Sequence, residues 1–315
     1  MGNFEIIEQP TGDRMMGGGL VKPKDERWKN FAPCMVSKDA VNCLEKVKSF
    51  EIFLDDIILT GYPRSGTTIV AEMLWLIASN FNFDKAKQLV TDDRVALLEF
   101  NDSTQLIQKG KVVDTFATLS RPRTLKTHLP LQFLPDQVWT KKPRMIYVSR
   151  DPRDVVVSMH HFESHMTGRQ LNETLDDFLN DRYFNCPYHE FHHNFLNIPN
   201  YPNILYLTYE SVTSNIDATI QKVADFLGVE ISSENFVKVK EHLKFDNMKK
   251  NKACNNTLFF EKVNEIYKKR TDTDKFIRRG KAGGYKDEMS QEYIEKFDKW
   301  MEKRNDVKTG FPKKH

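Results

Sequence analysis

The chain of 315 residues contains few cysteines, and they are not grouped. They show neither a metal-type Cys-x-x-Cys spacing nor a dense disulfide framework, which favours a reduced, intracellular protein: Cys34, Cys43, Cys186 and Cys254. No early basic-then-apolar segment resembles a signal peptide, and no apolar run reaches the length of a membrane span. The net charge of +3 does not indicate nucleic acid as a partner. We therefore expect a cytoplasmic protein without a membrane or nucleic-acid partner.

Internal repeats and linkers rich in proline or serine are also missing. A chain of 315 residues can bury one large core, and no composition break divides it. We therefore predict a single domain over residues 51–315, preceded by an irregular lead-in over residues 1–50 that ends in a short helix.

What is present from residue 57 onward is an alternation of short apolar runs and segments of helical periodicity. Strands are predicted at 57–59, 124–128, 145–148 and 204–207. Helices are predicted over 68–78, after Pro152, and through 220–227 with an end at Gly228. This alternation predicts an α/β fold with a central parallel sheet flanked by helices. Ligands of such sheets bind beyond the carboxyl ends of the strands.

A glycine-containing loop, Gly-Tyr-Pro-Arg-Ser-Gly-Thr-Thr, joins the first predicted strand to the first helix at residues 61–68. Its glycines have the GxxxxG spacing of a nucleotide P-loop. In such a loop backbone N–H groups and the helix N-terminus attract phosphate, and Arg64 adds a cation. Thr67 stands where the P-loop lysine would be, and no strand-end aspartate is available for magnesium, which disfavours a phosphotransferase. A tight turn with capping threonines is the alternative interpretation.

Lys126 and His128 alternate on a predicted strand, so their side chains share one face. A neutral imidazole, with an ordinary pKa of about 6.5, can take a proton from a hydroxyl group. A neighbouring cation suits a reaction in which negative charge grows nearby. From the residues alone, a structural or exposed histidine remains the alternative.

Four segments, in matching order, resemble motifs of the cytosolic sulfotransferases, which use 3′-phosphoadenosine 5′-phosphosulfate (PAPS). Residues 60–69 resemble TYPKSGTTW, the loop for the 5′-phosphosulfate, and residues 126–130 match KTHLP. Residues 150–158 resemble RNPKDVAVS of the 3′-phosphate segment, and residues 278–286 resemble RKGxxGxWK, which completes the 3′-phosphate grip. A separate 3′-phosphate site distinguishes a PAPS binder from an ATP binder. The resemblance implies the P-loop-like sulfotransferase fold.

The resemblance also implies transfer of a sulfonate group from PAPS to a hydroxyl of a small, largely apolar phenol or alcohol. The products are a sulfate ester and PAP, the desulfonated donor, and no metal is required. His128 is implied as the base, with Lys126 and Arg64 as further catalytic residues. The implied donor-binding residues are Arg64, Ser65, Gly66, Thr67, Thr68, Arg150, Ser158, Tyr209, Phe245, Met248, Arg278, Arg279 and Gly280. The implied acceptor-site residues are Lys126, His128 and Phe162, with Phe116 and His161 as further candidates.

Several positions depart from the family pattern. Arg64 replaces a lysine, Ile69 replaces the tryptophan that stacks on adenine, and Tyr285 replaces another tryptophan. These changes leave open a nucleotide- or ligand-binding protein of the same fold with little turnover. An alcohol dehydratase that acts through a sulfated intermediate is a further alternative. The dimer motif KxxxTVxxxE survives only in part, so both a monomer and a homodimer stay open: Lys286, Ser290, Gln291 and Glu295.

Overall fold

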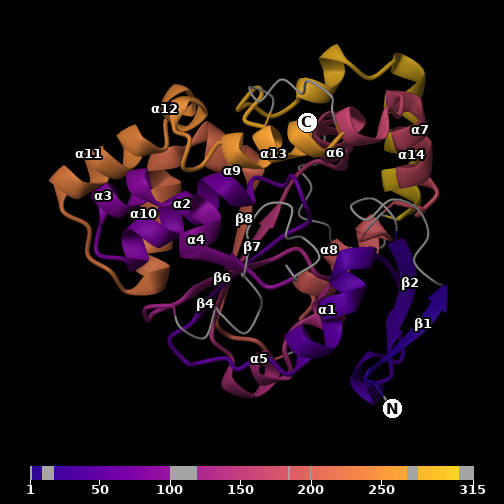
Figure 1. The fold of residues 1–315 in the computed structure, drawn as a ribbon, viewed down its shortest axis with the longest axis horizontal. Coiled ribbons are helices and arrows are strands. Elements are labelled where there is room, and N and C mark those ends of the chain that lie inside the picture. Colours follow the sequence, from indigo (N-terminus) through magenta and orange to yellow (C-terminus); the bar gives the residue numbers. More distant parts are fainter. Residues whose placement is uncertain are drawn as a thin grey trace.

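A computed structural model describes residues 2–8, 18–99, 119–183, 185–198, 200–267 and 276–304. In these ranges, a sheet of five parallel strands lies at the centre of the molecule, in the order β5-β6-β4-β7-β8 (Figure 1). The strands are β4 Ile57–Thr60, β5 Val95–Leu97, β6 Thr124–Thr127, β7 Arg144–Ser149 and β8 Ile204–Thr208. The predicted α/β fold is confirmed, and β5 is a strand that the sequence did not indicate.

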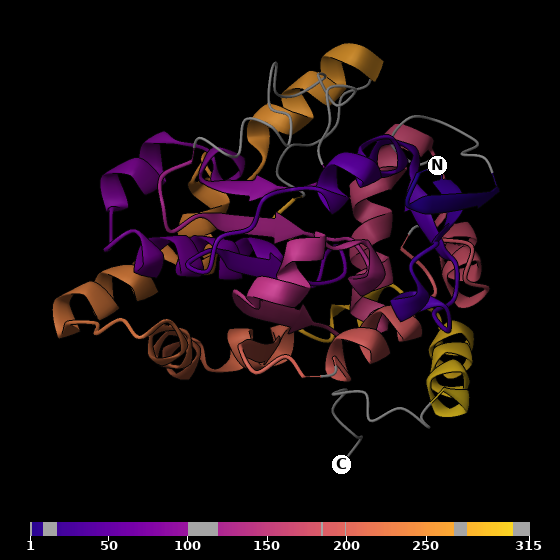
Figure 2. The same ribbon diagram turned by 90° about the horizontal axis from the view of Figure 1, so that it is seen from below.

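Side chains of the central strands alternate between two hydrophobic clusters. Ile58 and Met145 belong to one cluster, whereas Leu59 and Ile146 belong to the other. Successive side chains of a strand point to opposite faces, so the two clusters lie on the two sides of the sheet. Helices cover both sides (Figure 2). This double coverage explains why β4 and β7, in the middle of the sheet, contain continuous apolar runs.

The helices predicted from periodicity are present as α2 Thr67–Ala78, α6 Pro152–Thr167 and α10 Ile216–Leu227. Gly228 ends α10 with φ 69°, a left-handed conformation that glycine adopts at little cost. The other helices are α3 Phe83–Gln88, α4 Thr91–Arg94, α5 Asp136–Lys141, α7 Leu171–Leu179, α8 Tyr188–Leu196, α9 Tyr209–Ser214, α11 Ser233–His242, α12 Phe245–Lys250, α13 Thr257–Tyr267 and α14 Gln291–Lys303. Within the described ranges, no helix combines the length and apolar character needed to cross a bilayer.

Over residues 2–8 and 18–50, the described part of the lead-in, the chain is not irregular, which corrects the expectation. It forms an antiparallel sheet of β1 Phe4–Glu8, β2 Gly18–Pro23 and β3 Cys34–Ser37, followed by α1 Lys38–Lys48, the expected short helix. β2 was not predicted as a strand because its glycines and proline are typical of turns, although its residues alternate in burial. Its buried Val21 belongs to the same hydrophobic cluster as the central sheet, so the lead-in packs onto the main body. Figure 1 shows β1 and β2 on the opposite side of the molecule from α3 and α11.

All five strands of the central sheet are parallel, so their carboxyl ends meet at one edge. The residues at or just after these ends include Gly61 after β4, Glu99 after β5, His128 after β6, Arg150 after β7 and Tyr209 after β8. The topology therefore gathers one segment from each strand at a single place, where ligands of open α/β sheets bind.

Candidate functional site

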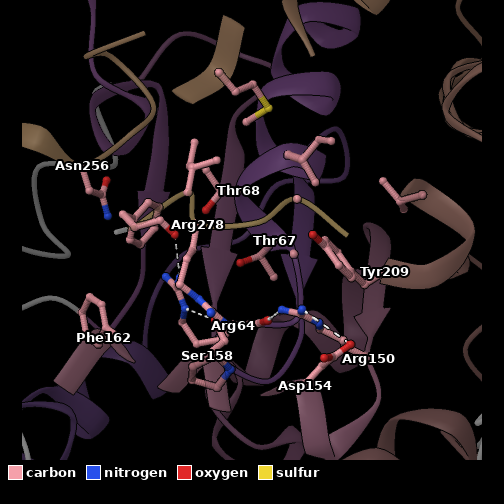
Figure 3. A pocket seen from close by; sticks show the side chains of 18 of the residues that line it. Arg64, Thr67, Thr68, Arg150, Asp154, Ser158, Phe162, Tyr209, Asn256 and Arg278 are labelled. Atoms are coloured by element: carbon pink, nitrogen blue, oxygen red, sulfur yellow. Dashed lines mark hydrogen bonds and ion pairs between the residues drawn. The ribbon is translucent and has the colours of Figure 1, made fainter. Parts of the chain in front are cut away.

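A pocket of about 540 Å³ lies beyond this edge of the sheet. Figure 3 shows Arg64, Thr67, Arg150, Ser158 and Arg278 around it. The predicted site residues that line the pocket are Arg64, Gly66, Thr67, Thr68, Lys126, His128, Arg150, Ser158, Phe162, Tyr209, Phe245, Met248, Arg278, Arg279 and Gly280. Ser65 is buried in the loop, Phe116 lies outside the described residues, and His161 instead contacts Glu288.

The loop between β4 and α2 needs glycine at two places. A Cβ on Gly61 would lie 2.4 Å from the carbonyl oxygen of Val148, and one on Gly66 would lie 2.4 Å from the ring of Tyr209. Gly66 also has φ 93°, which side chains rarely tolerate. The Ser65 hydroxyl oxygen is buried and, among the described residues, has no hydrogen-bond partner. A loop that carries an unused hydroxyl at a helix N-terminus fits a phosphate-like anion.

Arg64 joins three separate parts of the chain. Its Nε donates to the Ser158 hydroxyl on α6 at 3.1 Å, and its Nη2 donates to the Phe276 carbonyl at 2.8 Å. The guanidinium carbon lies 4.4 Å from the centroid of the Phe276 ring. Burial, with Arg150 nearby, lowers the pKa of Arg64 to about 10, so the side chain remains charged at neutral pH. The pocket thus holds a half-buried cation at the position where the related motif has lysine.

His128 is held by three hydrogen bonds. Its Nδ1 lies 2.7 Å from the Gly61 carbonyl oxygen, its backbone N–H donates to Glu99 Oε1 at 2.6 Å, and its carbonyl accepts from Asn185 Nδ2 at 2.8 Å. A carbonyl oxygen can only accept, so Nδ1 carries the proton and Nε2 keeps a free lone pair. Burial, followed by the charges of Lys126 and Arg64, lowers the pKa of His128 to about 3. The imidazole is therefore neutral at physiological pH.

Glu99 is a pocket residue that the sequence interpretation missed. It follows β5, a strand of only three residues, and the one available signal was an acidic residue after the apolar run Val95–Leu98. Burial raises the pKa of Glu99 to about 7, although the hydrogen bond from His128 and the charge of Lys126 oppose that rise. A second missed acid, Asp92, lies 3.7 Å from the Lys126 ammonium. The histidine and lysine thus have two acidic neighbours.

A second cationic cluster surrounds Arg150. Its Nη1 donates to the Arg64 carbonyl at 3.0 Å, and its guanidinium carbon lies 4.1 Å from the centroid of the Tyr209 ring. Its Nε is buried and lacks a hydrogen-bond partner within the described part of the chain. Ser158 lies further along α6, and Arg278 lines the same pocket. An unused guanidinium donor that shares a pocket with a hydroxyl and a second arginine fits a second phosphate group.

The carboxyl-terminal segment packs closely against α12. A Cβ on Gly280 would lie 2.0 Å from the ring of Phe245, so only glycine lets the two approach in this way. Gly280 also has φ 64°. Phe245 and Met248, both on α12, line the pocket beside this contact. An aromatic ring and a thioether next to a cationic loop fit a planar base attached to phosphate groups.

Aromatic side chains line another part of the pocket. Phe162 stacks on Phe259 with ring centroids 5.7 Å apart and an interplanar angle of 17°. The Phe276 ring lies 6.4 Å from that of Phe162, and Met159 also lines the pocket. Phe259 and Phe276 were not predicted for the acceptor wall. These surfaces suit a small apolar molecule.

Comparison with known proteins identifies the family. A sulfotransferase domain family matches residues 54–309. Luciferin sulfotransferase of Photinus pyralis is 30% identical over 82% of this chain and 74% of its own, and sulfotransferase 1E1 of Bos taurus is 31% identical over 85% and 89%. A crystal structure of retinol dehydratase with androsterone and PAP has a TM-score of 0.82, with 24% identity and coverage of 98% of both chains, which shows a shared fold. The chain belongs to the sulfotransferase family.

Proposed function

We propose that this protein transfers a sulfonate group from PAPS to a hydroxyl of a small, largely apolar phenol or alcohol, with His128 as the base. The observation that carries the proposal is the meeting, in one pocket, of two anion sites and a neutral histidine. The first anion site is the loop 64–68, and the second is the cluster of Arg150, Ser158 and Arg278. A nucleoside triphosphate has no group for a second site of this kind, whereas PAPS has its 3′-phosphate. Membership of the sulfotransferase family supports the same donor.

The residues of the pocket fit both the 5′-phosphosulfate and the 3′-phosphate of PAPS. The loop 65–68 would hold the 5′-phosphosulfate through its backbone N–H groups and through the unused hydroxyl of Ser65. Arg150, whose buried Nε has no partner among the described residues, would hold the 3′-phosphate together with Ser158 and Arg278. Phe245 and Met248 would contact the adenine. When bound, PAPS supplies the sulfonate group.

His128 acts on the acceptor. Its Nε2 takes the hydroxyl proton while the acceptor oxygen forms its bond to sulfur and the bond from sulfur to the bridging phosphate oxygen breaks. Because the pKa of His128 is lowered, the imidazole is neutral at pH 7 and its Nε2 lone pair is not blocked by a proton. Lys126 and Arg64 offset the negative charge that moves onto the leaving phosphate. The acceptor lies against the wall formed by Phe162, Phe259 and Phe276.

Calorimetric titration with PAP, ADP and ATP, without magnesium, tests the donor site. We expect PAP to bind much more tightly than ADP or ATP, and Arg150→Ala to remove most of that preference. Failure of the unsubstituted protein to bind PAP would contradict the proposal. A panel of phenols and alcohols with PAPS, followed by mass spectrometry, then tests turnover. Formation of a sulfate ester supports the proposal, an elimination product indicates a dehydratase, and PAP binding without product indicates a binding protein.

A further inference from the structure

The carboxylate of Asp154, in the first turn of α6, accepts hydrogen bonds from the backbone of a distant loop. Its Oδ2 accepts the N–H of Gly283 at 2.7 Å, and its Oδ1 accepts the N–H of Tyr285 at 2.9 Å. Only 2% of this side chain is exposed. Both oxygens therefore fasten one loop, residues 278–285, to the start of α6.

Asp154 binds the backbone of this loop and does not serve as the cap of α6. Asp151 already caps α6 by accepting the N–H of Arg153, so Asp154 is not needed as the cap. Gly283 has φ 77° and starts the short helix η6 Gly284–Asp287, which brings the N–H groups of residues 283 and 285 toward one carboxylate. A buried carboxylate is costly unless hydrogen bonds and a counter-charge satisfy it. The loop and Arg150 supply both.

Asp154 also contacts Arg150, whose Nη2 lies 3.8 Å from Asp154 Oδ2 (Figure 3). One side chain thus touches Arg150 on one side and the loop that carries Arg278, Arg279 and Gly280 on the other. These are the two groups that would hold the 3′-phosphate. Other contacts tie the same segment to α6, namely Glu288 to His161 and the Tyr285 ring to Arg153, but neither involves the loop backbone.

We propose that Asp154 is a positioning residue for donor binding: it holds Arg150 and the loop 278–285 in register so that both reach the same phosphate. The role rests on the proposed PAPS site. The proposal can be tested because Asp154 is negatively charged, like the phosphate that it helps to bind, so charge and positioning predict opposite effects of neutralising it. By charge alone, neutralising Asp154 strengthens PAP binding. By positioning, neutralising it weakens PAP binding, because one N–H group of the loop loses its acceptor.

The experiment is calorimetric titration of PAP into the protein and its Asp154→Asn variant. We expect PAP binding to weaken by about 10-fold or more, the size of one lost hydrogen bond to a charged group. The KM for PAPS should rise in parallel, whereas kcat at saturating PAPS should change by less than about threefold, because His128 is untouched. Hydrogen exchange of the amides of Gly283 and Tyr285 should become faster.

Asp287→Asn is the matched control. Asp287 belongs to the same segment and pairs with Arg279, but its side chain is 58% exposed and accepts no backbone N–H from the loop 278–285. We expect this variant to bind PAP as tightly as the unsubstituted protein or more tightly. Asp154→Glu provides a second variant if Asp154→Asn fails to fold, since it keeps the charge but displaces the carboxylate, and it should also weaken PAP binding.

Unchanged or tighter PAP binding in the Asp154 variants would overturn the positioning role. Equal weakening by Asp287→Asn would also overturn it, because the weakening would then not depend on the hydrogen bonds that Asp154 accepts from the loop backbone. If the unsubstituted protein does not bind PAP, the proposed function itself fails and this role fails with it.

Discussion

The imidazole Nδ1 of His128 and the carbonyl oxygen of Gly61 lie 2.7 Å apart. Gly61 follows β4 and begins the loop proposed to hold the phosphosulfate, whereas His128 follows the neighbouring strand β6. The hydrogen bond fixes which ring nitrogen carries the proton, and it also ties the proposed base to the proposed donor loop. Two adjacent parallel strands therefore set the distance between the base and the anion site.

Replacing His128 with asparagine tests the base directly. The amide nitrogen of asparagine can still donate to the Gly61 carbonyl, but the variant has no counterpart of Nε2. We expect kcat to fall by about 10²–10⁴-fold, the usual contribution of general base catalysis. PAP affinity, measured by calorimetry, should stay within a few-fold of the unsubstituted protein. A variant that keeps its kcat would show that His128 is not the base.

Glu99 should make stability depend on pH. Burial raises the pKa of Glu99 from 4.5 to about 7, so the folded protein keeps a proton that the unfolded chain releases at lower pH. Between these values the contribution of Glu99 to stability falls as pH rises. Glu99→Gln removes this effect. We therefore expect the free energy of unfolding of the variant, relative to that of the unsubstituted protein, to rise by about 1–3 kcal/mol from pH 5 to pH 8. Chemical denaturation at both pH values measures the difference. A difference in unfolding free energy between the two proteins that is the same at both pH values would contradict the prediction.

Arg64→Lys and Arg64→Met separate charge from shape at the donor loop. Lysine keeps the cation but loses the paired contacts with Ser158 and the Phe276 carbonyl. We expect Arg64→Lys to keep kcat within about 10-fold, and Arg64→Met to lose about 10²–10³-fold, as when one stabilising donor is removed from a reacting oxygen. Steady-state turnover at saturating PAPS distinguishes the variants. Comparable activity in both would exclude a role for the charge of Arg64.

Ile69→Trp restores the aromatic residue of the related motif. Ile69 lies in the first turns of α2 and lines the pocket, as Phe245 does. Stacking of an aromatic ring on a base contributes about 1–3 kcal/mol, so we expect PAP binding to tighten by about 10-fold. Ile69→Val, the control, should leave affinity within about threefold. If tryptophan weakens PAP binding, the adenine does not approach this position.

The central sheet could be predicted from the sequence because β4, β7 and β8 each contain an apolar run of three or four residues near a segment of helical periodicity. β5 escaped prediction because three residues are too few to show a pattern. β2 escaped because its glycines and proline resemble a turn. In both cases pairing with a neighbouring strand overrides the local preference.

The sequence by itself determined the chemistry of the anion loop, the second cationic segment and the lysine–histidine pair, because these depend on residue types at short spacing. Only the tertiary structure decided that Arg64 reaches Phe276, 212 positions away, and that Asp154 reaches Gly283, 129 positions away. It likewise decided that Glu99 meets His128, and that Phe259 stacks on Phe162. Such contacts follow from the packing of helices and loops around one edge of the sheet. Local sequence patterns do not predict them, because the contacting segments are far apart in the chain.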